Sequence, residues 1–257
     1  MNKFINKLVE IEVIQNVIDG EEFVLTEDFS KVLEVEINNL KSITNYCIDV
    51  PSNNLKGAIP YVDSVSAVSD VDDNPTDELD VEIKLNSYEL NQIMAYIPVN
   101  GTIQALSPEA FKTLVSKVLA KEFIRKLNYK ASQLIKQQAK NVVSASIVSR
   151  EQVVDNMISL CYGAKNGFIL ADSLKINDLL NVLDKDLLQL LEIKMIPVEN
   201  LGNCVIFGDF NELCYLHKAK EMSVQEDFLK NVKNIFIKEY NTFVISNPNS
   251  FAVIELV

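Results

Sequence analysis

The sequence is poor in the residues that most enzyme sites need. It contains one histidine, His217, and only seven glycines among 257 residues. An acid–base mechanism built on imidazole would have to use His217, and seven glycines are few for loops that cradle phosphate groups. The G-x-S-x-G, P-loop, G-x-G-x-x-G and H-E-x-x-H strings are all missing from the sequence. We therefore expect no active site of these kinds and no cofactor.

The sequence also has fewer basic than acidic residues. The chain carries 24 Lys and Arg against 36 Asp and Glu, which gives a formal net charge of -12, and its pI is about 4.6. Sequence-independent nucleic-acid binding needs clustered basic residues, so a tight grip on DNA or RNA is not expected. No apolar run approaches the length of a membrane span, and charges interrupt residues 1–18, so we also expect a cytoplasmic protein without membrane contact.

The cysteines and the acidic residues could in principle hold a metal. The four cysteines include no C-x-x-C pair, so buried reduced thiols are favoured over a zinc site. Residues 63–80 contain an acidic cluster without Lys or Arg, whose oxygens could bind Ca²⁺, but the spacing excludes an EF-hand loop. A solvated surface is the favoured interpretation, and no metal is expected. The cluster consists of Asp63, Asp70, Asp72, Asp73, Asp77, Glu78 and Asp80.

Two helices are expected from apolar periodicity. Residues 29–40 repeat their apolar side chains at helical intervals. Ser107-Pro108-Glu109 is a strong helix start, and no proline or glycine follows until Gly163. A helix over residues 108–143 would be about 54 Å long at 1.5 Å per residue. It would be the longest element of the chain.

Period-two alternation predicts several strands. Leu79, Val81, Ile83 and Leu85 alternate with charged residues, so residues 52–85 are expected to form an extended two-stranded ribbon. Further β-prone runs are residues 42–50, 167–170, 190–197, 204–207, 228–239, 242–245 and 251–257. Shorter helical patterns are residues 1–18, 150–160 and 174–183. Helices and strands together indicate an α+β protein.

The last quarter of the chain contains two short motifs. In the first, residues 201–210, a β-prone stretch ends at the turn signal Gly208-Asp209. In the second, residues 247–251, the turn signal Asn247-Pro248 leads into a last apolar strand. Together they resemble the closing segment of tailed-phage major capsid proteins of the Hong Kong 97 type, where a G-x-x-x-x-F-G-D-F strand precedes an N-P-x-x-F strand.

The order of the elements resembles this family over nearly the whole chain. The resemblance implies a Hong Kong 97 type capsid fold with an N-terminal arm, an extended β-ribbon loop, a peripheral domain with a long spine helix, and an axial domain. The implied boundaries are 1–24 for the arm, 25–54 for the first part of the peripheral domain, 55–85 for the extended loop, 86–148 for the peripheral domain with the spine helix, 149–224 for the axial domain and 225–257 for the closing strands.

The resemblance also implies a function without an enzyme active site. The chain would be a major capsid protein that assembles in the bacterial cytoplasm into the pentamers and hexamers of a virion shell around double-stranded DNA, without sequence-specific DNA binding. The expected partners are other copies of the chain, a scaffolding protein and a portal. Intersubunit contacts are implied for Lys56, Asp70, Asp72, Asp73, Asp77, Glu78, Gly208, Asp209 and Phe210.

Two alternatives stay open at the level of sequence. An encapsulin-like nanocompartment, which shares the fold but encloses cargo enzymes, would suit an amphipathic helix over residues 1–18. A small cytoplasmic hydrolase would have to rely on His217 with Asp209 or Cys214.

Overall fold

The computed structural model describes ten stretches of the chain. They are residues 27–65, 81–99, 108–139, 141–145, 166–176, 179, 185–190, 192–218, 223–229 and 232–256. The predicted helices over residues 1–18 and 150–160, and most of the one over 174–183, lie outside them. The chain divides into two compact units, one with residues 1–45, 92–128 and 219–240, the other with residues 46–91, 129–218 and 241–257.

The first unit contains two helical segments and a group of paired strands. Helix α3 (Glu27–Asn38) confirms the helix predicted from periodicity and is followed by the 3₁₀ turn η1 (Ile43–Asn45). Strand β10 (Ser223–Leu229) pairs antiparallel with the first half of β11 (Val232–Ile245), and β4 (Asn91–Val99) also pairs with β11. The prediction of two separate runs at 228–239 and 242–245 was wrong, because β11 is one strand of 14 residues.

Helix α4 (Pro108–Gln138) contributes residues to both units, and its 31 residues correspond to about 47 Å at 1.5 Å per residue. From residue 115 to residue 132 it buries two neighbouring side chains in each turn, as expected of an amphipathic helix without glycine. The buried residues at four-residue spacing are Val115, Leu119, Phe123, Leu127, Ala131 and Ile135.

The predicted end of this helix, residue 143, was wrong. The helix stops at Gln138, and β5 (Asn141–Ala145) follows. Strand β5 pairs in parallel with β12 (Phe251–Leu256), with Val142 opposite Val253. Pairing with a strand more than a hundred residues away therefore decides the boundary, and neither a proline nor a glycine marks it locally.

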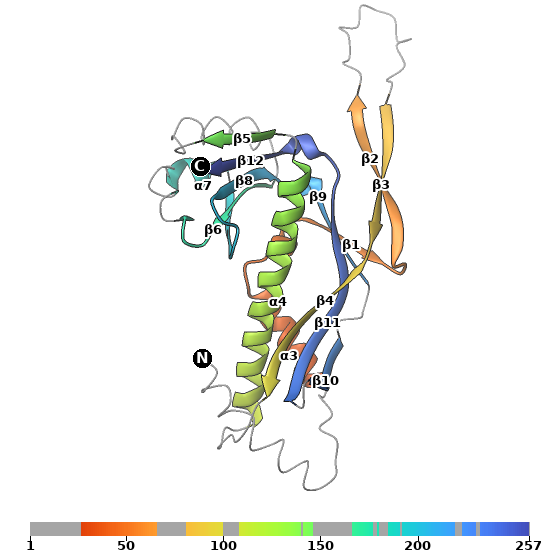
Figure 1. Ribbon diagram of the computed structural model, residues 1–257, viewed down its shortest axis with the longest axis vertical. Coiled ribbons are helices and arrows are strands. Elements are labelled where there is room, and N and C mark those ends of the chain that lie inside the picture. The colour runs from red at the N-terminus through yellow and green to blue at the C-terminus, as the bar shows by residue number, and fades with distance from the viewer. Residues whose placement is uncertain are drawn as a thin grey trace, which may run out of the picture. The chain divides into compact units, whose positions relative to one another are not determined.

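The second unit is built on a five-stranded sheet with the order β5-β12-β8-β6-β7. Figure 1 labels four of its strands, β5, β12, β8 and β6. Its central strands β8 (Cys204–Asp209) and β6 (Gly167–Asp172) are buried along their first five residues, as their uninterrupted apolar runs require. Strand β5 forms one edge of this sheet, and strand β7 (Lys194–Val198) forms the other. The prediction of a strand from residue 190 was wrong at its start, because helix α7 (Lys185–Leu190) precedes β7.

The second unit also holds a three-strand arrangement. Strand β1 (Ile48–Ser52) pairs in parallel with β9 (Leu213–Lys218), which pairs antiparallel with residues 241–245 of β11. The strand predicted over 42–50 was expected to end before Pro51, but β1 includes this proline. Proline is tolerated there because β1 is an edge strand, paired on one side only among the described strands.

Strands β2 (Lys56–Val65) and β3 (Val81–Glu89) form an antiparallel two-stranded sheet, which we call the ribbon (Figure 1). The ribbon confirms the extended two-stranded structure expected from alternating residues. A register shift between Val62 and Ser64 interrupts the ladder.

Candidate intersubunit surfaces

Residues 201–210 and 247–256, which contain the two motifs of the last quarter, form what we call the closing segment. They lie side by side, because β8 pairs antiparallel with β12 and Gly208 stands opposite Phe251. A Cβ atom at position 208 would lie 2.5 Å from Cδ1 of Phe251 and 2.8 Å from the Ser250 carbonyl oxygen. Glycine is therefore needed at this position because the Phe251 ring packs on the bare backbone.

Aromatic rings stack through the closing segment. The centroid of the Phe210 ring is 3.9 Å from that of Phe168 and 5.6 Å from that of Tyr46, and Phe168 in turn lies 6.0 Å from Phe251. The three phenylalanines have no solvent-exposed surface. We call Tyr46, Phe168, Phe210 and Phe251 the aromatic column. It links β6, the turn that follows β8, and β12 to the chain that leads into β1, so the F-G-D-F and N-P-x-x-F motifs serve packing within the subunit.

The turn signals of both motifs act as caps. The Asp209 carboxylate accepts a hydrogen bond from the backbone N–H of Asn211 at 2.9 Å, at the start of the 3₁₀ turn η2 (Phe210–Glu212). The Asn247 side chain accepts one from the backbone N–H of Asn249 at 3.0 Å, before η3 (Pro248–Ser250). Short side chains that satisfy nearby backbone donors favour such turns. The turn predicted at Asn247-Pro248 is confirmed, whereas β8 includes Gly208 and Asp209 and the turn begins after them, at Phe210.

Asn166 holds three segments together next to the aromatic column. Its side-chain amide donates to the Tyr46 carbonyl oxygen and to Oδ1 of Asn211, both at 3.3 Å, and its Oδ1 accepts from the Lys194 ammonium at 3.0 Å. The Lys194 ammonium also lies 5.6 Å from the centroid of the Tyr46 ring. No sequence pattern indicates this cluster, because Tyr46 and Asn166 are 120 positions apart and no local motif connects them.

The ribbon is attached to its own unit through one face. The Asn86 amide donates to the Ile245 carbonyl oxygen at 2.6 Å, and the Tyr88 hydroxyl lies 3.0 Å from the Ser52 hydroxyl. Gly57 packs under the Tyr88 ring, where a Cβ atom would lie 2.6 Å from the hydroxyl oxygen. Because side chains alternate along a strand, Asn86 and Tyr88 share one face, and residues 83, 85 and 87 lie on the other.

Among the described residues, the side chains on that other face are mostly apolar and exposed. Ile83 and Leu85 of β3 are 65% and 68% exposed, and the cross-strand partner of Leu85 on β2 is Pro60, which is also exposed. Ala58 continues the same face opposite Ser87. Exposed apolar side chains gathered on one face make it a candidate interaction surface. We call Ala58, Pro60, Ile83 and Leu85 the apolar ribbon face.

The residues for which intersubunit contacts were implied have different environments. Lys56 is exposed and pairs with Glu89, 3.0 Å away across the ribbon. Gly208 and Phe210 are buried within their own unit, which assigns them a role inside the subunit, while Asp209 is partly exposed. Their contact with a neighbouring subunit stays a prediction. Asp70, Asp72, Asp73, Asp77 and Glu78 lie outside the described residues.

Two of the residues considered for a hydrolase, His217 and Cys214, lie on the same strand but point away from each other. His217 contacts Asp49, with 2.9 Å between Nε2 and Oδ1, and stacks on Tyr215. Cys214 lies three positions from His217 on β9 and therefore points to the opposite face of the strand. Burial raises the pKa of the Cys214 thiol, so less of the thiolate nucleophile forms at neutral pH. The geometry does not join His217 to Cys214.

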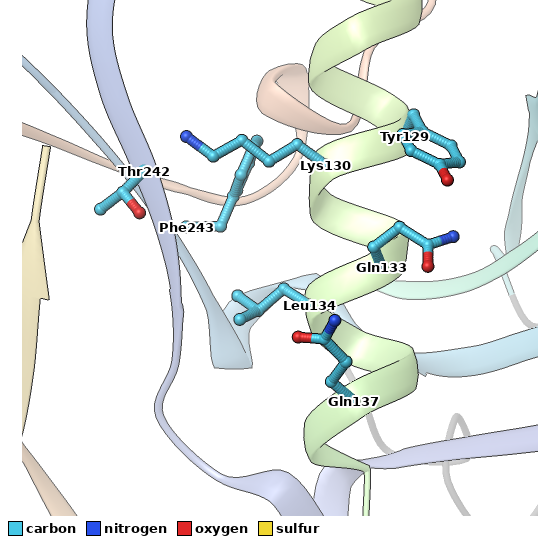
Figure 2. A pocket seen from close by; sticks show the side chains of 7 residues that line it. All are labelled: Tyr129, Lys130, Gln133, Leu134, Gln137, Thr242 and Phe243. Atoms are coloured by element: carbon cyan, nitrogen blue, oxygen red, sulfur yellow. The ribbon is translucent and has the colours of Figure 1, made fainter. Parts of the chain in front are cut away.

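A pocket of about 340 Å³ lies between α4 and the end of β11 in the second unit. Figure 2 shows Lys130 and Leu134 extending from the helix toward the strand that carries Thr242 and Phe243. The Lys130 ammonium donates to the carbonyl oxygen and Oδ1 of Asn241, at 2.8 and 3.2 Å. The accessible lining of this pocket is mostly apolar.

The described stretches contain no group of three or more His, Cys, Asp or Glu side chains arranged to hold a metal ion. Likewise, none of the helices within them has the length and apolar character needed to cross a bilayer.

Known structures resemble this chain, although neither protein-family models nor curated protein sequences match it. A virus-like particle from Pyrococcus furiosus matches with a TM-score of 0.61 at 13% identity, covering 90% of this chain and 100% of that one. A chain of the satellite phage P4 procapsid with its size determination protein matches with a TM-score of 0.56 at 11% identity, covering 88% and 98%. The holo-SrpI encapsulin complex from Synechococcus elongatus gives a TM-score of 0.51 at 12% identity, covering 85% and 88%.

These matches show that the chain has the fold of phage and virus-like particle shell proteins. It is a mixed α+β fold of the Hong Kong 97 capsid type, as the closing segment and the order of elements implied. Because the sequences of these proteins are only 10 to 13% identical to this one, the matches show similarity of the fold alone.

Proposed function

We propose that this chain is a structural shell protein, the major capsid protein of a tailed bacterial virus. Copies of it would assemble into pentamers and hexamers that close into an icosahedral shell around double-stranded DNA. One observation carries the proposal, the apolar ribbon face, which is uncovered in the isolated chain. A soluble protein rarely leaves such a surface exposed without a partner.

The shape of the ribbon supports contact with another copy. A two-stranded sheet alone is marginally stable in water, so the ribbon needs a second surface to rest on. If that surface lies elsewhere on an identical chain, the contact is heterologous, and heterologous contacts produce rings when the rotation closes. Pentamers and hexamers are such rings.

Each part of the fold would then have its own role in the shell. Residues 1–24 would form the arm, and residues 55–85 the extended loop that lies over a neighbouring subunit. Residues 149–224 would form the axial domain around the fivefold and sixfold axes, with residues 25–54, 86–148 and 225–257 as the peripheral domain. A scaffolding protein and a portal would take part in assembly in the host cytoplasm. A net charge of -12 suits a shell that confines DNA without adhering to it.

Particle formation by the full chain tests this proposal. Negative-stain microscopy and sedimentation of the wild type, with scaffolding protein supplied, should show shells, rings or tubes. The variant Ile83→Ser/Leu85→Ser should remain folded and sediment as a monomer, because it removes the apolar ribbon face. Val35→Ser, which removes an exposed apolar side chain from α3, is the matched control. A wild-type chain that stays monomeric under all conditions would contradict the proposal.

The match to the encapsulin complex from Synechococcus elongatus supports the encapsulin-like alternative. The contents of purified particles distinguish the two functions. Nuclease-protected DNA in particles formed in an infected or induced host supports the capsid, whereas a stoichiometric co-purifying protein with no protected DNA supports a nanocompartment.

A further inference from the structure

Leu174 is the most exposed large apolar side chain of the described residues, with 86% of its surface accessible to solvent. It lies in the turn that directly follows β6, and we call residues 172–175 the Leu174 turn. A single exposed apolar residue is common on protein surfaces and needs no partner by itself. Leu174 differs from the ordinary case because its turn is held in place and because the same unit contains a mostly apolar pocket.

The Asp172 carboxylate fixes the Leu174 turn. Its Oδ1 accepts a hydrogen bond from the backbone N–H of Leu174 at 3.1 Å, and its Oδ2 accepts one from the backbone N–H of Gly202 at 3.3 Å. The backbone N–H of Lys175 donates to the Asp172 carbonyl oxygen at 2.8 Å. The turn is therefore tied both to β6, which Asp172 ends, and to the loop between β7 and β8. Because this backbone is already ordered, a partner that binds Leu174 loses less conformational entropy.

The pocket between α4 and the end of β11 can accept an apolar side chain. Its volume of about 340 Å³ leaves room for the four carbon atoms of a leucine side chain. Leu134 and Phe243 supply apolar surface, and Gln133, Gln137 and Thr242 add polar groups to the same lining (Figure 2). An apolar pocket with polar groups beside it is the kind of place where one side chain anchors a protein–protein interface.

The charges of the two surfaces are complementary. Lys130 is the charged residue of the pocket lining. The Leu174 turn and the loop bound to it, residues 199–203, include the acids Asp172 and Glu199 and one lysine, Lys175, a net charge of -1. A surface with a small negative charge would thus meet a pocket with one positive charge. Complementary charges favour this partner over surfaces of like charge.

We propose that Leu174 of one copy inserts into the pocket between α4 and β11 of a second copy. Every copy carries both the side chain and the pocket, so the two are present in a one-to-one ratio in any assembly. The surfaces that meet are different, so the contact is heterologous, and such a contact repeats from copy to copy until a ring closes. This inference rests on the proposed function and adds a contact of the second unit that does not involve the ribbon.

Disulfide trapping between different copies tests this contact. The full-length variant Leu174→Cys is mixed in equal amounts with Gln133→Cys or with Gln137→Cys, assembled, and oxidised with copper phenanthroline. We expect at least one mixture to give a covalent dimer on a non-reducing gel in a yield well above that of each variant alone. In the matched control, Val142→Cys replaces Leu174→Cys and places the thiol at another exposed apolar position of the same unit. Shells in which neither mixture gives more dimer than the control would overturn the inference.

Truncation of the side chain gives an independent result. Leu174→Ser should raise the protein concentration needed for assembly about tenfold or more, because the variant loses the burial of a leucine side chain. Its thermal unfolding as a monomer should match that of the wild type, since Leu174 is 86% exposed. Gln133→Trp, which places a bulky ring at the pocket, should weaken assembly in the same way. The double variant should be little worse than either single one, because each already removes the same contact.

The control for truncation is Val142→Ser, which removes an exposed apolar side chain elsewhere in the same unit. If the wild type forms shells and Leu174→Ser assembles like this control, the inference fails and the proposed function stands. If the wild type forms no assembly, both fail.

Discussion

The closing segment and the ribbon contain similar residues, but these are buried in the first region and exposed in the second. Both contain apolar side chains on neighbouring antiparallel strands, and both need a glycine beneath an aromatic ring, Gly208 under Phe251 and Gly57 under Tyr88. In the closing segment the apolar side chains are covered by their own subunit, whereas Ile83 and Leu85 of the ribbon are exposed. The difference indicates that the first region holds the subunit together, and it supports the proposal that the second acts between subunits.

The largest effect on stability is expected from Phe210→Ala. Phe210 is fully buried between Tyr46 and Phe168 in the aromatic column, so truncation leaves a cavity and should lower the free energy of unfolding by about 3–5 kcal/mol. Denaturant unfolding followed by far-UV circular dichroism measures the change. Leu85→Ala is the control from the ribbon, and a loss of similar size in both variants would remove the distinction between the two regions.

A smaller loss is expected from Gly208→Ala. The added methyl group would lie 2.5 Å from the Phe251 ring and 2.8 Å from a backbone oxygen, and such overpacking costs about 1–3 kcal/mol. In the double variant with Phe251→Leu, the ring contact is relieved but the backbone contact stays. The two substitutions should therefore be less than additive in a double-mutant cycle of unfolding free energies. Strict additivity would show that the Phe251 ring is not the obstacle.

The ribbon and the start of α4 were predictable because their signals are local. Strict alternation around Ile83 marks a strand with two different faces, and Ser107-Pro108 marks a helix start whatever the rest of the chain does. The end of α4 was mispredicted because residues 141–145 become a strand only by pairing with β12. Helix propensity near Gln138 contains no information about that pairing.

The closing segment was only partly predictable for the same reason. Its two turns follow from Asp209 and Asn247, whose short side chains bind the backbone two residues later. The aromatic column could not be predicted, because nothing in the sequence says that Tyr46 meets Phe210 across more than 160 positions.

A modest pH-dependent effect is expected from Glu212→Gln, at the edge of the closing segment. Burial raises the pKa of the Glu212 carboxyl, and the charge of Asp209 raises it further. Since the folded pKa exceeds the unfolded value of about 4.3, folding favours the protonated form, and Glu212 reduces stability increasingly as the pH rises through the folded pKa. The variant should have a higher Tm than the wild type at pH 7 and the same Tm near pH 4. The control is Glu34→Gln on α3, an exposed glutamate; an equal gain at both pH values would contradict the role of ionisation.

The smallest effect on stability is expected from Leu85→Ser, and it decides the comparison between the two regions. Leu85 is 68% exposed, so its removal should change the free energy of unfolding by no more than about 0.5 kcal/mol. The same variant should raise the protein concentration at which particles form, because an exposed apolar side chain that a neighbour covers contributes only when the neighbour is present. Unfolding of the monomer and sedimentation of the assembly, measured on one preparation, separate the two quantities. A large loss of monomer stability would mean that the ribbon is packed within its own subunit, and an unchanged assembly threshold would mean that its apolar face is not what neighbouring copies bind.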